Sequence, residues 1–149
     1  MAPLLVLSAT RDAVRQVAHN LRPEDRREVR AATGMEPAEA TMASWRISEE
    51  CYTVRTELGQ SPFAVFGVNT RLGHAGIWLL ATPAIRHAWL RMIEEAPKHL
   101  SRLAQKYGPL YNYVDVRNSA HLRWCLKVGF NTGPSIKVGS HDFIQVVYK

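Results

Sequence analysis

Two side chains stand out for the chemistry they could perform, the thiol of Cys125 and the imidazole of His74. A thiol can donate a proton or attack an acyl carbon, and a neutral imidazole is a competent base near neutral pH. Each also has a simpler interpretation: a free cysteine is commonly a buried small hydrophobe, and His74 lies in a glycine-containing turn where a histidine would be solvated. Their chemistry therefore depends on the elements that position them.

The segment from Val114 to Phe130 predicts how Cys125 is held. An apolar strand ends at Asn118, and a helix of about three turns follows it. Gly129 ends this helix before a new strand begins at Phe130. The predicted order is strand, helix, strand, with Asn118 at the first junction.

Apolar periodicity and turn residues predict the remaining elements. Strands are expected near Leu4–Leu7, Cys51–Glu57, Phe63–Val68, Ile77–Leu80, Leu110–Val116, Phe130–Ile136 and Phe143–Tyr148. Helices are expected from Asp12 to Leu21, from Arg22 to Gly34, from Pro37 to Glu49 and from Ala84 to Lys106. Glu24 and Asp25 suit the positive end of the second helix, and Pro97 is expected to kink or break the last one. The first three helices are expected to lie across one edge of the sheet.

Length and composition favour one globular domain over residues 1–149. The chain is 46% hydrophobic and 21% charged, which is too apolar for disorder. Its net charge of +6 fits an anionic partner, such as a CoA phosphate, a nucleic acid or a membrane surface, without choosing among them. The predicted long helix carries five basic residues: Arg86, Arg91, Lys98, Arg102 and Lys106. They favour a solvated positive face, and nonspecific contact with nucleic acid is the alternative.

Several signals are missing from the sequence. No basic region precedes the apolar run at Leu4–Leu7, and no segment has the roughly eighteen uninterrupted apolar residues of a membrane span. Cys51 and Cys125 have no metal-binding spacing, and the six histidines show no zinc motif. We therefore expect a soluble protein with reduced thiols, no signal peptide and no bound metal.

Asn118 at the strand-to-helix junction, followed eleven residues later by Gly129-Phe130, resembles the C-terminal motif of the GNAT acetyltransferase superfamily. The predicted element order is similar to the GNAT order over nearly the whole chain. The resemblance implies an α/β (α+β) fold of the acyl-CoA N-acyltransferase type, with a mixed, mostly antiparallel sheet that splits between the strands ending at Ala81 and at Asn118. It also implies that the Asn118 side chain lies beside acetyl-CoA and that the backbone of Leu79 and Ala81 pairs with the pantetheine arm.

In this family a basic, glycine-rich loop holds the CoA pyrophosphate at the start of the long helix. The matching segment here keeps Thr82 and Arg86, but His87 and Trp89 replace the expected glycines. The resemblance implies that Thr82, Arg86 and the free amides after Pro83 bind the phosphates. The alternative is a plain capped helix with a solvated Arg86.

Acetyl transfer to an amine needs a base for the ammonium and an acid for the leaving thiolate. Many GNAT members place the acid, a tyrosine, seven residues after the junction asparagine, which is the position of Cys125 here. The strands from Phe63 to Leu80 contain no carboxylate, so the usual glutamate base is missing and His74 is its possible substitute. Cys125 and His74 are the candidate catalytic residues.

A narrower resemblance covers most of the chain in order. Its segments are Leu21–Gly34 with Met35 and Pro37, Phe66–Val68, Trp78–Thr82, Tyr113–Asn118 and Leu122–Trp124. They are similar to small GNAT-like proteins of tailed bacteriophages, some of which resemble an internal virion protein of short-tailed phages associated with genome ejection.

This narrower likeness implies a protein of the virion or the host bacterial cytoplasm, with phage virion proteins or a host protein as partners. It also implies weak or no acetyltransferase activity, because such proteins can keep the fold without the catalysis. The alternative is an active acetyl-CoA-dependent N-acetyltransferase acting on an unknown amine or protein.

Overall fold

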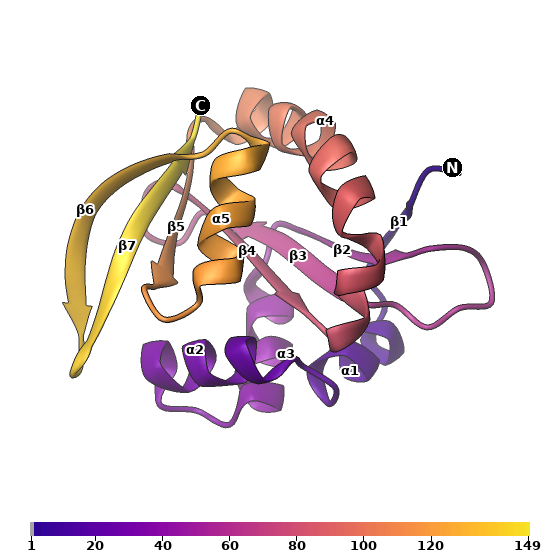
Figure 1. The fold of residues 1–149 in the computed structure, drawn as a ribbon, viewed down its shortest axis with the longest axis horizontal. Coiled ribbons are helices and arrows are strands. Elements are labelled where there is room, and N and C mark those ends of the chain that lie inside the picture. Colours follow the sequence, from indigo (N-terminus) through magenta and orange to yellow (C-terminus); the bar gives the residue numbers. More distant parts are fainter. Residues whose placement is uncertain (1) are drawn as a thin grey trace.

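A computed structural model describes residues 2–149 and confirms the predicted α/β fold class. Strands and helices follow one another in the expected order (Figure 1). The elements are β1 (Leu5–Ser8), α1 (Arg11–Ala18), α2 (Pro23–Thr33), α3 (Pro37–Ile47), β2 (Glu50–Arg55), β3 (Ala64–Asn69), β4 (Ala75–Ala81), the 3₁₀ helix η1 (Pro83–Ala88), α4 (Trp89–Tyr107), β5 (Leu110–Asp115), α5 (Ser119–Val128), β6 (Asn131–Val138) and β7 (His141–Tyr148).

The strands form one mixed sheet in the order β1-β2-β3-β4-β5-β7-β6. Within residues 2–149 its only parallel neighbours are β4 and β5, which pair at Ala75 with Leu110 and at Gly76 with Tyr111. After these two positions the ladder stops, although β4 continues to Ala81 and β5 to Asp115. The sheet therefore splits between the strands that the sequence predicts, and a gap opens toward their carboxyl ends.

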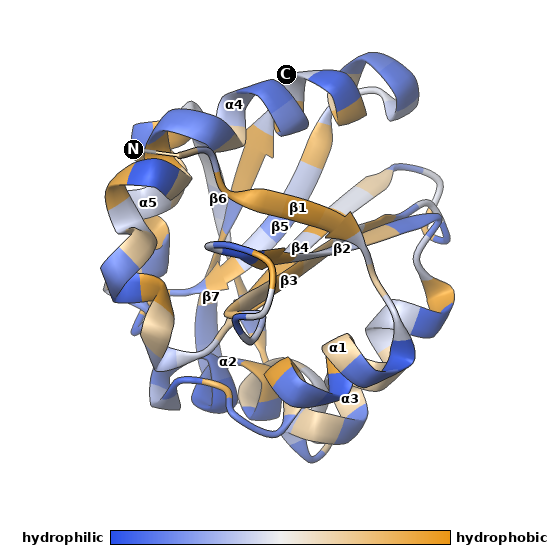
Figure 2. Cartoon of the chain, turned by 90° about the vertical axis from the view of Figure 1, so that its right-hand side faces the viewer, coloured by the Kyte–Doolittle hydropathy of each residue, from blue (hydrophilic) through white to orange (hydrophobic). Residues whose placement is uncertain are grey.

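Helices cover both faces of the sheet. Helices α4 and α5 lie over one face, and α1, α2 and α3 lie over the other (Figure 1). Each face has its own apolar cluster: the larger includes Phe66, Leu103 and Trp124, and the smaller includes Val14 and Val65. Figure 2 shows the hydrophobic colour concentrated on the strands between the helical layers. The first three helices thus cover a face of the sheet rather than an edge, because their apolar sides bury the second cluster.

The long helix is not broken at Pro97. Helix α4 runs without interruption from Trp89 to Tyr107, and the change in helix type comes earlier, where η1 ends at Ala88. Contacts hold α4 on both sides of the proline: Glu95 accepts a hydrogen bond from the Leu4 N–H, and Arg102 donates to Glu50. These tertiary contacts support a helix that continues past the proline. None of the helices in residues 2–149 is both long enough and apolar enough to cross a bilayer.

Candidate functional site

The gap between β4 and β5 is occupied by side chains of α2. The Asp25 carboxylate accepts a hydrogen bond from the Ala81 N–H at 2.9 Å, and the backbone N–H of Arg22 donates to the Ala81 carbonyl at 2.9 Å. Asp25 is fully buried, with 0% of its surface exposed. Both backbone groups of Ala81 on the gap side are therefore already paired within the chain.

The opposite side of the gap is paired in the same way. Glu28 accepts a hydrogen bond from the Asp115 N–H at 2.6 Å through Oε1. Asn118, only 1% exposed, donates from Nδ2 to Asp25 Oδ1 at 3.1 Å and to Glu28 Oε2 at 3.3 Å. The side chains of Arg22, Asp25, Glu28, Asn118 and His121, here called the gap cluster, thus connect α2 with β4, β5 and α5.

Two cationic groups face the two carboxylates of the gap cluster. Arg22 Nε lies 3.0 Å from Asp25 Oδ2, and His121 Nδ1 lies 3.6 Å from Glu28 Oε2. Burial lowers the pKa of His121, but interactions with Cys125 and Glu28 outweigh it and raise this pKa well above its ordinary value of 6.5. A protonated His121 makes the cluster neutral overall, as a buried set of charges requires.

Local sequence explains why these side chains converge. Asp25 and Glu28 are three residues apart on α2, so they project from the same side of the helix. Asn118 is the N-cap of α5, where its Oδ1 accepts from the His121 N–H at 3.4 Å. The capping geometry leaves the Asn118 amide nitrogen free to face the two carboxylates.

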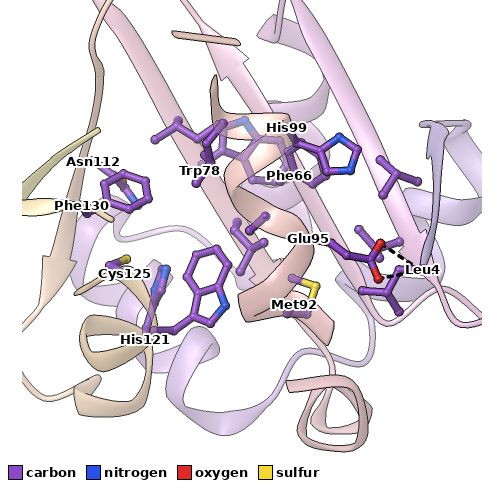
Figure 3. Close-up of a pocket in the computed structure, with 17 residues that line it drawn as sticks. Leu4, Phe66, Trp78, Met92, Glu95, His99, Asn112, His121, Cys125 and Phe130 are labelled. Atoms are coloured by element: carbon purple, nitrogen blue, oxygen red, sulfur yellow. Dashed lines mark hydrogen bonds between the residues drawn. The ribbon is translucent and has the colours of Figure 1, made fainter. Parts of the chain in front are cut away.

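An apolar cavity of about 50 Å³ lies between the sheet and helices α4 and α5. Cys125 and His121 lie close together at its lower left in Figure 3, and Phe66 and His99 lie on its upper side. The two residues are four apart on α5, so they share one side of that helix. Cys125 is 2% exposed. The imidazole of His121 therefore lies between the buried thiol of Cys125 and the carboxylate of Glu28, and interacts with both.

The predicted site residues separate into two groups. Asn118 is linked to Ala81 through Asp25, and Leu79 lines the cavity together with Cys125. Thr82 follows Ala81 and is buried, with its N–H donated to the Phe63 carbonyl.

Arg86 and His74 form the second group, and both are exposed. Arg86 is exposed on η1, and His74 is exposed in the turn before β4, where its ring packs edge-on against Tyr111. Since β4 spans seven residues, His74 and Ala81 are separated by about 23 Å at about 3.3 Å per residue. The structure does not bring His74 to the other candidates.

Three residues of this region, Asp25, Glu28 and His121, are not among the sequence candidates. Their signals were present: an i,i+3 pair of acids on α2, and the i,i+4 spacing of His121 and Cys125 on α5. An acid in the first turn of a helix is already explained by its favourable interaction with the helix dipole. The sequence therefore gives no reason to expect that such an acid is buried. Only the packing of α2 over the gap distinguishes the two cases.

Comparison with solved structures identifies the arrangement of elements as the GNAT fold. A GNAT-family acetyltransferase from Bacillus anthracis superimposes with a TM-score of 0.70 at 14% identity, covering 99% of this chain and 95% of that one. No protein-family model and no curated protein sequence matches the chain. The expected fold is thereby confirmed, at a level of identity that speaks for the fold alone.

Two further similar structures contain ligands. AAC(6′)-Ib in complex with ribostamycin and coenzyme A gives a TM-score of 0.73 at 12% identity, covering 99% of this chain and 94% of that one. The spermidine N-acetyltransferase from Vibrio cholerae, in complex with CoA and spermine, gives 0.66 at 13% identity, covering 97% and 94%. Solved structures of this fold therefore include complexes that hold coenzyme A together with ribostamycin or spermine.

Proposed function

We propose that this chain is a GNAT-fold protein with weak or no acetyl-CoA-dependent turnover, which serves a tailed bacteriophage as a virion-associated or ejection-related component. The proposal combines two arguments. The filled gap supports the loss of turnover, and the sequence resemblance to phage proteins supports the setting. The partners would be other virion proteins or a host protein.

The single observation that carries the loss of turnover is the pairing of Ala81. A pantetheine arm that bound along β4 would need its N–H and carbonyl, and these are engaged by Asp25 and the Arg22 backbone. Displacing a buried, hydrogen-bonded carboxylate leaves polar groups without partners, which is costly. The absence of glycines beside Arg86 and the distance of His74 from the gap work in the same direction.

The direct test is ligand binding by the full-length protein. A ligand present at a hundred times its dissociation constant stabilises a protein by about 2.7 kcal/mol. We expect no rise in melting temperature with millimolar acetyl-CoA, and no release of free CoA thiol when spermine is added as acceptor. A clear thermal shift together with spermine-dependent thiol release would overturn the proposal.

The setting has its own test. We expect mass spectrometry of purified phage particles to detect the protein, and we expect Arg86→Ala to leave phage infectivity unchanged. Absence from particles would exclude the virion role and leave only a partner in the host cell.

An active N-acetyltransferase acting on an amine or protein remains the second candidate, and one observation favours it. Cys125 and His121 line an apolar cavity beside Leu79, at the position where the family places its proton donor. If catalysis occurs there, Cys125→Ser would lower turnover by about 10²-fold or more, whereas Cys51→Ser would not. Equal rates for the two variants would exclude this role of Cys125.

A further inference from the structure

Three side chains of the gap cluster offer atoms that commonly bind metal ions. One carboxylate oxygen of Asp25, one of Glu28 and one imidazole nitrogen of His121 all lie within 4.8 Å of one another. Asp25 and Glu28 come from α2, whereas His121 comes from α5. All three residues are buried. The sequence spacing of the histidines could not reveal this group, because His121 lies more than ninety positions after Asp25 and Glu28 in the chain.

His121 supplies a second, independent observation. It is 3% exposed, and its Nδ1 has no hydrogen-bond partner within residues 2–149. The nearest acidic atom, Glu28 Oε2, lies at 3.6 Å, which is longer than a hydrogen bond. Buried polar atoms are nearly always satisfied, so an unpaired nitrogen near the Glu28 carboxylate needs an explanation. A cation between the three groups, bound in place of the His121 proton, would give this nitrogen a partner.

The other contacts of the cluster limit where a cation could lie. Arg22 Nε and the Ala81 N–H both approach Asp25 Oδ2, and the Asp115 N–H occupies Glu28 Oε1. The remaining oxygens, Asp25 Oδ1 and Glu28 Oε2, share the amide nitrogen of Asn118 at 3.1 and 3.3 Å. A cation would therefore have to displace this amide nitrogen.

Asn118 can make way by rotating its amide. Oxygen and nitrogen of an amide are nearly equal in size, so a half-turn exchanges them. The rotation sacrifices the Oδ1 contact with the His121 N–H, which is long at 3.4 Å. It would place Oδ1 beside the carboxylate oxygens, where only a cation would make it favourable. The ligand set would then be one imidazole nitrogen and three oxygens.

We propose that Asp25, Glu28 and His121, with Asn118 Oδ1 as a fourth ligand, form a structural site for one divalent transition-metal ion of the zinc type. Zinc binds imidazole nitrogen and carboxylate oxygen at about 2.0–2.2 Å, usually with four ligands. An imidazole ligand favours such an ion over magnesium or calcium. The ion would fasten α2 to α5 across the gap, and its binding is independent of whether the protein has acetyltransferase activity.

The test uses the full-length protein, stripped with EDTA and then incubated with ZnCl₂ or CoCl₂. We expect one equivalent of zinc to remain after gel filtration, a higher melting temperature, and visible absorption bands from the cobalt form. Glu28→Gln and His121→Ala should each weaken zinc binding by at least 100-fold and abolish the cobalt bands. His87→Ala and His141→Ala are the matched controls at histidines outside the cluster, and both should bind as the wild type does.

Asn118→Asp keeps the test decisive if the other variants fold poorly. An additional carboxylate in place of the amide should raise zinc affinity about tenfold or more and make the melting temperature of this variant strongly dependent on the metal. The proposal is overturned if the wild type retains less than a tenth of an equivalent, or if His87→Ala loses the ion as His121→Ala does. It is equally overturned if Asn118→Asp gains no affinity.

Discussion

Asn118 illustrates how one amide side chain can link several elements across the gap between two strands. Its oxygen caps α5, and its nitrogen donates to carboxylates of α2 on either side of the gap. In the GNAT resemblance the same position lies beside the acyl-CoA. The sequence therefore predicts that Asn118 forms hydrogen bonds at this junction. It does not predict the partners, which are Asp25 and Glu28 of α2.

At Asp25 we expect Asp25→Asn to destabilise the protein by about 3–5 kcal/mol, because it leaves the buried Arg22 guanidinium without its counter-charge. Urea unfolding of both proteins at neutral pH measures the difference. Asp12→Asn in the first turn of α1 is the control, since Asp12 is exposed and should change the free energy of unfolding by less than about 0.5 kcal/mol. Similar losses for the two variants would show that the gap cluster contributes little.

At the scale of elements, Glu50 fastens α4 to the sheet. This residue of β2 accepts hydrogen bonds from Lys106 at 2.8 Å, Tyr107 at 2.6 Å and Arg102 at 3.1 Å, and also from Tyr52. Burial raises the pKa of Glu50, but these donors outweigh it and hold the pKa far below the ordinary value of 4.5. The stabilisation is therefore complete above about pH 4.5 and is lost as the pH falls toward the pKa of the folded state.

The corresponding variant is Glu50→Gln. We expect it to lower the free energy of unfolding by about 2 kcal/mol at pH 7, since a hydrogen bond to a charged group contributes about 1.5–3 kcal/mol to stability. The difference in free energy of unfolding between the two proteins should shrink at pH 3, because the stabilisation by the ionised Glu50 carboxylate decreases as the pH falls below 4.5. Denaturant titrations at both pH values give the comparison, with exposed Glu49→Gln as control. A difference independent of pH would mean that the charge of Glu50 has no part in the effect.

The glycine that ends α5 allows a further prediction. Gly129 has φ 114° and Gly34, which ends α2, has φ 70°. Alanine is strained at either position by about 1 kcal/mol. A Cβ on Gly129 would also lie 3.3 Å from the Tyr148 ring, whereas one on Gly34 meets nothing within 4 Å. We expect thermal denaturation to show a larger loss for Gly129→Ala than for Gly34→Ala, and equal losses would exclude a contribution from Tyr148.

The order of the elements, the split of the sheet and the position of Asn118 could all be predicted, because they depend on local periodicity and turn residues. The role of α2 could not. Asp25 and Glu28 have an ordinary explanation at the start of a helix, and their burial depends on how α2 packs over strands that are more than fifty residues away. The absence of a break at Pro97 could not be predicted either, since the contacts of Glu95 and Arg102 lie outside any local window.

At the scale of the whole molecule, the gap cluster should make the two halves of the sheet unfold together. The amides of Ala81 and Asp115 donate to buried carboxylates rather than to water. We expect hydrogen exchange followed by NMR to find both amides as protected as those of buried β3, and far more protected than those of exposed β6. Rapid exchange at Ala81 would mean that α2 detaches from the gap readily.

The filled gap also makes any ligand a competitor of the protein's own helix. If detaching α2 costs about 3 kcal/mol, a ligand that takes over the backbone of Ala81 binds about 10²-fold more weakly than it would to an open gap, because 1.4 kcal/mol corresponds to a factor of ten. Substitutions that empty the gap would raise affinity and lower the stability of the fold by related amounts. Affinity at this position and stability of the fold are therefore opposed, and a change at Asp25 alters both.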